Sequence, residues 1–147
     1  MIRLRPHHLL CMLTYAGRGY TPRFTSGMDD LMRRLGSGEE ITLIDGPDDI
    51  CAPWLGEATS TTEIRVPHCH EDRISGRDVR AAADIGALLG RSMNAGSTLR
   101  LDAALLAKLR TAYRADTIRS GCSGCEWKSF CDGLSADDFA GCKLNAD

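Results

Sequence analysis

The amino-acid sequence predicts a single small α+β domain over residues 1–147, mostly helical, with four or five helices and two short strands. A chain of 147 residues with 43% hydrophobic content can bury one core and is too short for two independent ones. Apolar residues recur at helical spacing in several segments, whereas only two short stretches have the composition of strands. The last stretch, residues 119–147, is rich in cysteine and predicts a metal-binding tail.

Two helices are predicted in the N-terminal part of the chain. Pro6 suits the first turn of a helix and no helix-breaking residue follows before Gly17, which predicts a helix over 6–16. After a loop punctuated by glycine and proline, apolar residues fall at positions i, i+3, i+4 and i+7 of a second segment. This spacing creates one apolar face and predicts a helix over 26–35, with Met28, Leu31, Met32 and Leu35 in the core.

The middle of the chain is expected to hold a strand, a loop and a helix. Residues 41–44 are apolar or β-branched and are followed by an Asp-Gly-Pro turn signal, which predicts a short strand. Residues 48–70 show little periodicity and are expected to form a loop. Ser75 and Asp78 have the spacing of a capping box, and an apolar stripe continues after them, which predicts a helix over 76–89.

The remaining elements precede the cysteine-rich tail. A second short strand is expected at 98–101. Asp102 then has the position of an N-cap, and apolar residues at helical spacing predict a helix that runs to about Ile118. Beyond Gly121 the chain is polar and rich in cysteine, and we expect this tail to fold back onto the loop that contains Asp48–Cys51.

The composition argues against several classes of protein. A net charge of −2 and a pI near 6.1 provide no global field that would attract nucleic acid or an anionic membrane. No stretch approaches the roughly 18 apolar residues of a membrane-spanning helix, and no early run is long enough for a secretory signal, so we expect a soluble cytoplasmic protein. Seven cysteines in a reducing cytoplasm indicate metal or redox chemistry, since an odd number cannot pair fully in disulfides.

Cys122, Cys125 and Cys131 form a C-x2-C-x5-C pattern directly after a predicted helix. Two residues between the first pair let the backbone turn so that both thiolates converge on one centre, and the next five allow one helical turn before the third. Zinc sites use such pairs too, but commonly as two pairs, whereas this chain has one pair and a lone third cysteine. The pattern therefore favours an iron–sulfur cluster of the [4Fe-4S] type, with zinc as the alternative.

A cluster of this kind needs a fourth ligand, and the other cysteines are candidates for it. Cys51 is favoured because it follows a Gly-Pro turn in a predicted loop, where the backbone can be shaped around a metal. The alternatives are Cys69, which lies between two histidines, Cys142, which is close to the tail in sequence, and Cys11.

His7, His8 and Cys11 form a separate group in the N-terminal helix. His7 and Cys11, at i and i+4, share a helical face and have a workable spacing for binding one metal ion. The simpler interpretation is that His7 caps the helix and Cys11 packs inward. Arg3 and Arg5 would attract a small anionic ligand to the helix start, where a histidine could exchange protons at cellular pH. His7 and His8 are therefore the candidate catalytic residues.

Several motifs together resemble the prokaryotic family catalogued as domain of unknown function twelve eighty-four, often labelled iron–sulfur-binding. The resemblance rests on Arg-Leu-Arg-Pro-His-His-Leu-Leu-Cys at 3–11, on Gly19-Tyr20, on Gly-Pro-Asp-Asp-Ile-Cys at 46–51, and on the cysteine pattern at 122–131. It implies an iron–sulfur cofactor and does not imply a particular reaction.

The expected function is that of an iron–sulfur protein in electron transfer or redox sensing, acting with a redox partner. The chain contains no nucleotide-binding loop, no nucleophile elbow and no paired-histidine zinc-protease motif. Two alternatives stay open at this stage. One is a metal-dependent enzyme whose active site includes His7 and His8, and the other is a zinc-stabilised interaction module.

Overall fold

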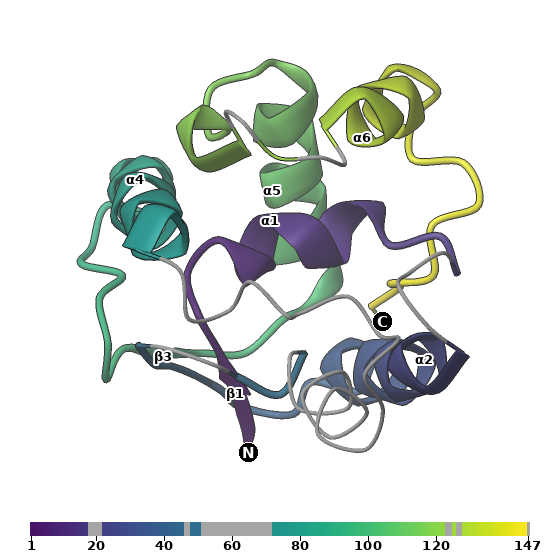
Figure 1. Cartoon of the computed structure of the whole chain (residues 1–147), viewed down its shortest axis with the longest axis horizontal. Helices are drawn as coiled ribbons and strands as arrows, with labels where there is room; N and C mark the ends of the chain where they lie inside the picture. The colour runs from purple at the N-terminus through teal and green to yellow at the C-terminus, as the bar shows by residue number, and fades with distance from the viewer. Residues whose placement is uncertain (18–21, 46–47, 51–71, 123–124, 126–127, 147) are drawn as a thin grey trace.

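A computed structural model describes residues 1–17, 22–45, 48–50, 72–122, 125 and 128–146 of the chain (Figure 1). This part contains five α-helices and one three-stranded sheet, which confirms a small α+β domain that is mostly helical. The helices are α1 (His8–Cys11), α2 (Pro22–Gly36), α4 (Asp72–Leu89), α5 (Ala103–Arg114) and α6 (Lys128–Ala136); the strands are β1 (Ile2–Leu4), β2 (Ile41–Leu43) and β3 (Thr98–Leu99); and two short 3-10 turns are η1 (Met12–Thr14) and η2 (Ser120–Cys122).

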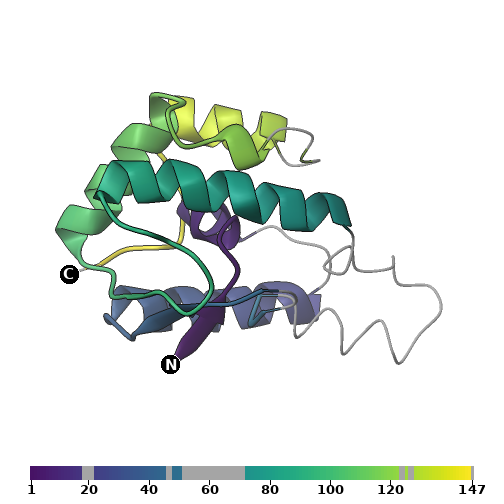
Figure 2. The ribbon, with the colours of Figure 1, turned by 90° about the vertical axis from the view of Figure 1, so that its left-hand side faces the viewer.

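The short helix α1 lies in the middle of the molecule. Both views show the sheet and α2 on one side of it, and α4, α5 and α6 on the other (Figures 1 and 2). The apolar side chains of α1 and η1 are almost completely buried: Leu9, Leu10, Met12 and Leu13. Polar side chains of α1 must therefore find partners within the protein.

Among the described helices, none is both long enough and apolar enough to cross a bilayer.

The sheet determines where the chain enters α1. Strand β1 pairs in parallel with β2, and β3 pairs antiparallel with β2 on its other side. Ile2 lies opposite Ile41 and Leu4 opposite Leu43, and all four side chains are fully buried. Because β1 ends only a few residues before α1, this pairing positions the start of the helix.

The helix predicted over 6–16 is shorter in the structure. α1 ends at Cys11, continues as η1, and the backbone becomes extended at Tyr15. The Tyr15 hydroxyl lies 3.0 Å from the carbonyl oxygen of Thr25 and 2.8 Å from the Asp29 carboxylate, both in α2. These contacts draw the chain towards α2 and out of the helical path.

Two other helices begin earlier than the pattern predicts. α2 begins at Pro22, which suits a first helical turn, and α4 begins at Asp72. The capping box predicted from Ser75 and Asp78 is wrong, because both residues lie inside α4. The Asp78 carboxylate is instead available to groups outside its own helix.

The helix after Asp102 begins where the sequence predicts and ends earlier than predicted. The Asp102 side chain accepts a hydrogen bond from the Leu105 amide at 2.7 Å, which confirms the N-cap. α5 ends at Arg114 rather than near Ile118, because Asp116 has a φ of 64°, which a right-handed helix does not accommodate.

The strands predicted at 41–44 and 98–101 are present in shortened form. The sequence pattern does not predict β1 or α6. β1 is too short to show alternation, and α6 extends the single turn expected before Cys131 to nine residues. The tail packs against η1, α5 and α4. Its predicted contact with the loop around Cys51 stays a prediction, since Cys51 lies outside the described residues.

Gly121 allows η2 to lie directly against α4. A Cβ at this position would lie 2.9 Å from the carbonyl oxygen of Arg77 and 3.3 Å from the Cβ of Ala81. Backbone and Cβ atoms cannot move aside as a flexible side chain can. The absence of a side chain at Gly121 therefore brings the neighbouring Cys122 close to the body of the domain.

We expect Gly121→Ala to lower the free energy of unfolding by about 1–3 kcal/mol, the usual cost of overpacking. Gly133→Ala in α6 is the matched control, because no other part of the described chain lies within 4 Å of its Cβ position and alanine favours a helix over glycine by about 1 kcal/mol. Urea unfolding followed by circular dichroism measures both. Equal stability of the two variants would contradict the close contact.

Candidate metal centre around the first helix

His7, His8 and Cys11 present their side chains on one face at the start of α1. Positions three and four apart in a helix are neighbours, so Cys11 lies between the two histidines around the helix axis. One ligand atom from each of the three residues lies within 4.8 Å of the others. The two imidazole rings are 4.2 Å apart between centroids. The i, i+4 pairing expected for His7 and Cys11 is thus present, with His8 as a third member.

His7 is held by Asp78 from α4. Its Nδ1 lies 2.6 Å from Asp78 Oδ1, and its backbone amide donates to the same oxygen at 3.2 Å. Asp78 Oδ2 accepts a hydrogen bond from Arg5 Nε at 2.8 Å, and the Arg5 side chain is 1% exposed. Burial would raise the pKa of Asp78, but His7 and Arg5 together lower it below its usual value. Asp78 is therefore an ionised carboxylate shared by a histidine and an arginine.

His8 has an equivalent partner in Asp48. Its Nδ1 lies 2.6 Å from Asp48 Oδ2, which also accepts from the Arg5 amide at 2.7 Å. The other oxygen, Oδ1, accepts from the Ile50 amide at 3.0 Å. The Asp48 side chain has no exposed surface. The Asp48–Ile50 segment is therefore attached to the start of α1.

These contacts place the proton of each imidazole on Nδ1. A carboxylate next to Nδ1 accepts that N–H, which leaves the lone pair on Nε2. Burial, together with the neighbouring His8, lowers the pKa of His7 to about 4, although Asp78 opposes this. His7 is therefore neutral at neutral pH. Within the described residues, no hydrogen-bond partner of either Nε2 is found.

The cysteines of the tail lie near the same face. Burial raises the pKa of the Cys11 thiol, and the neighbouring Cys125, Cys122 and Cys131 raise it further. The residue as a whole is nevertheless exposed to solvent and is not part of the closed core. The three tail cysteines are partly exposed and also interact with one another. The structure thus brings together the C-x2-C-x5-C cysteines and Cys11.

Polar groups surround the tail thiols. Cys131 Sγ lies 3.1 Å from the Thr14 hydroxyl and is also hydrogen-bonded by Tyr113. The Arg119 guanidinium lies 4.3 Å from the centroid of the Tyr113 ring and beside Cys122. Burial raises the pKa of the Cys122 thiol, and Arg119 opposes this. Arg119 Nε and Nη2 are buried and have no hydrogen-bond partner among the described residues.

The other predicted ligands are less well placed or lie outside the described residues. Cys142 is partly exposed. Burial raises the pKa of its thiol, and Cys131 raises it further. Cys51 and Cys69 are outside the described part, so their roles as ligands stay predictions.

The two arginines expected to attract an anion to the start of the helix are paired with carboxylates of the protein. Arg5 is buried against Asp78, and Arg3 lies 3.0 Å from Asp49. Internal carboxylates therefore neutralise the two arginines that were expected to attract an anion. Sequence reasoning missed Asp48 and Asp78 as histidine partners. The local signals in the sequence were that Asp48 follows a Gly-Pro turn and that Asp78 has the spacing of a capping box with Ser75.

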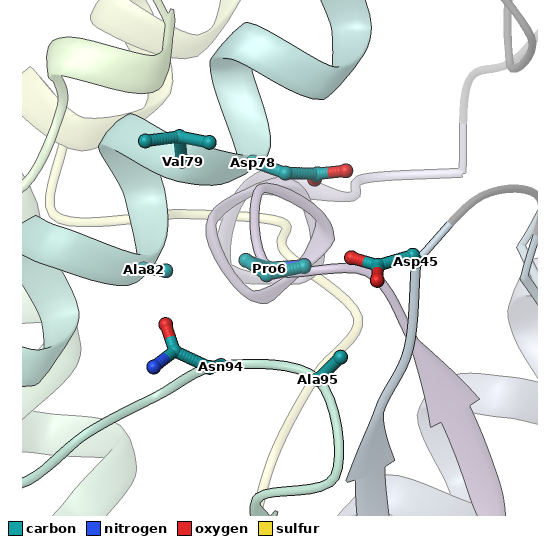
Figure 3. Close-up of a pocket in the computed structure, with 7 residues that line it drawn as sticks. All are labelled: Pro6, Asp45, Asp78, Val79, Ala82, Asn94 and Ala95. Atoms are coloured by element: carbon teal, nitrogen blue, oxygen red, sulfur yellow. The ribbon is translucent and has the colours of Figure 1, made fainter.

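A separate open pocket lies between α4, Pro6 and the segment that contains Asn94 and Ala95 (Figure 3). It has a volume of about 480 Å³ and is lined by Pro6, Asp45, Asp78, Val79, Ala82, Asn94 and Ala95. No histidine or cysteine lines it. The pocket therefore shares only Asp78 with the histidine cluster.

Comparison with known proteins gives one match. A family model described as a protein of unknown function (DUF1284) matches residues 19–131, a range that includes the three tail cysteines but not α1. No curated protein and no solved structure matches the chain.

We expect Asp78→Ala to lower the free energy of unfolding by about 3–5 kcal/mol, because it removes the buried carboxylate that Arg5 and His7 share. Asp30→Ala is the control, since Asp30 and its partner Arg33 are both exposed and such pairs contribute about 0–1 kcal/mol. Chemical unfolding of both variants measures the difference. Similar unfolding midpoints would show that the buried pair does not support the fold.

Proposed function

Since the chain belongs to the DUF1284 family of proteins of unknown function, its role must be inferred from its own residues, and we propose that it is an iron–sulfur protein of electron transfer or redox sensing. The observation that carries this proposal is the grouping of Cys122, Cys125 and Cys131, whose thiols interact with one another. Thiolates are the usual ligands of iron–sulfur clusters.

The surroundings of the tail fit a negatively charged, sulfur-rich group. Arg119 lies next to Cys122; its Nη1 pairs with Asp132, and its buried Nε and Nη2 have no hydrogen-bond partner among the described residues. The hydroxyl groups of Thr14 and Tyr113 are close to Cys131. Hydrogen bonds and positive charge near the sulfurs tune the potential of a cluster, so these side chains have a clear role if one is bound.

Cys51 remains the proposed fourth ligand of a [4Fe-4S] cluster. It directly follows Ile50, and the Asp48–Ile50 segment is attached by hydrogen bonds to the Arg5 amide and to His8. The chain before Cys51 is thus held next to α1, and α1 lies beside the tail cysteines. Among the described residues, the alternative fourth ligand is Cys11, whose thiol interacts with the three tail cysteines.

A redox role agrees with the exposure of the tail. Cys122, Cys125 and Cys131 are each partly exposed rather than enclosed in the core. A bound cluster supplies a centre that accepts and releases one electron. Because electron transfer slows steeply with distance, a centre near the surface suits exchange with a partner protein.

We expect the anaerobically purified protein to be brown and to contain iron and acid-labile sulfide. Cys131→Ser should lose most of both, because a cluster ligand is removed, whereas Cys142→Ser should retain them, since Cys142 lies at the margin of the group. Iron and sulfide analysis with absorption spectra measures this. A colourless protein with stoichiometric zinc and no sulfide, even after cluster reconstitution, would reject the proposal in favour of a zinc site.

A further inference from the structure

We propose that His7, His8 and Cys11 form a second metal site, distinct from that of the tail, which binds one divalent ion of the zinc type. Imidazole nitrogens and thiolates are the usual protein donors to zinc, and a site with three protein ligands leaves a fourth position open to water or a small anion. The site does not depend on the nature of the metal in the tail.

The spacing of the donor atoms supports this site. Zinc binds nitrogen at about 2.0–2.1 Å and sulfur at about 2.3 Å, so ligand atoms around a tetrahedral ion lie roughly 3.4–3.6 Å apart. The three atoms here already lie within 4.8 Å of one another. The donor atoms are therefore already close to the spacing that such an ion requires.

The two carboxylates provide a second and independent argument. A metal-binding histidine commonly donates its other N–H to a carboxylate, which fixes the ring and its tautomer. Here Asp78 holds Nδ1 of His7, and Asp48 holds Nδ1 of His8, each at 2.6 Å. Both rings thus keep Nε2 for a ligand.

The rival explanation is that the histidines only fasten α1 to its neighbours. His7 and His8 are 7% and 9% exposed, and polar groups buried to this degree normally have partners for all their polar atoms. In the described part of the chain neither Nε2 has a partner, and neither is sealed from solvent. Both Nε2 atoms are therefore accessible to an external ligand, which a purely fastening role would not require.

Cys11 belongs with the histidines rather than with the tail. Among the described residues, the group of metal-binding side chains that converges within 4.8 Å contains His7, His8 and Cys11, and none of the tail cysteines. Cys11 is still close enough to the tail thiols to interact electrostatically. The two sites are therefore neighbours, and Cys51 is left to complete the cluster.

The first experiment titrates Zn²⁺ into the anaerobically purified, cluster-loaded chain after removal of loosely bound metal. We expect one Zn²⁺ to bind beyond the iron. The double variant His7→Asn/His8→Asn should bind it at least about 100-fold more weakly and keep its iron and sulfide, because asparagine retains an N–H for each carboxylate but lacks Nε2. Unchanged zinc binding by this variant would overturn the proposal.

Serine substitutions test whether the two sites are separate. Cys11→Ser should lose the zinc and keep iron and sulfide, with Cys142→Ser as the control that keeps all three. If Cys11→Ser loses iron and sulfide while Cys51→Ser retains them, Cys11 is a cluster ligand and the proposal of a separate site is wrong.

A further pair of variants tests the carboxylates as positioning residues. Asp48→Asn should weaken zinc binding by about 10–100-fold, the usual effect of losing a carboxylate partner of a metal-binding histidine. Asp49→Asn is the matched control, because Asp49 binds Arg3 and, among the described residues, no histidine. Equal zinc affinity of the two variants at a temperature where both are folded would contradict the role of Asp48.

A failure of the proposed cluster can be told apart from a failure of this site. If the wild-type chain contains no sulfide, Co²⁺ is titrated into Cys122→Ser/Cys131→Ser, whose tail can no longer chelate a metal ion. One bound Co²⁺ with a thiolate-to-metal charge-transfer band, lost on adding His7→Asn/His8→Asn, would support the histidine site. Absence of Co²⁺ binding, with the fold intact by circular dichroism, would overturn it.

Discussion

The fold and the candidate metal site both depend on two buried carboxylates, Asp48 and Asp78, that face the start of α1. Asp78 connects α4 to Arg5 and His7, and Asp48 connects its own segment to the Arg5 amide and to His8. Buried carboxylates are costly unless their oxygens accept hydrogen bonds, and here both oxygens of each do so. Through these contacts, three segments that are far apart in the sequence meet at one short helix.

Stability alone does not explain this arrangement. The desolvation of a buried ion pair offsets most of its attraction, so apolar side chains of similar size could hold α1 in place equally well. Apolar side chains could not fix the tautomer and orientation of two adjacent imidazoles. The proposed metal ion at the histidines would use this property of the carboxylates.

The two proposed sites share α1 and the residues around it. The Cys11 thiol interacts with the tail cysteines, and Thr14, which follows α1 in η1, contacts Cys131. A divalent ion at the histidines would place positive charge beside the tail and would favour its thiolates. Tyr113 of α5 and Arg119 also interact with the tail thiols. Chemistry at one site would therefore influence the other electrostatically.

The sequence by itself determined the fold class, the strands near 41–44 and 98–101, the N-cap at Asp102 and the cysteine pattern of the tail. These features follow from local periodicity, turn signals and spacing, which are visible in short windows. Only the tertiary structure decided that Asp78 faces His7 across 71 positions and that Asp48 faces His8 across 40. No local pattern links such pairs, because a buried charge is matched by whichever side chain the packing of distant segments brings to it.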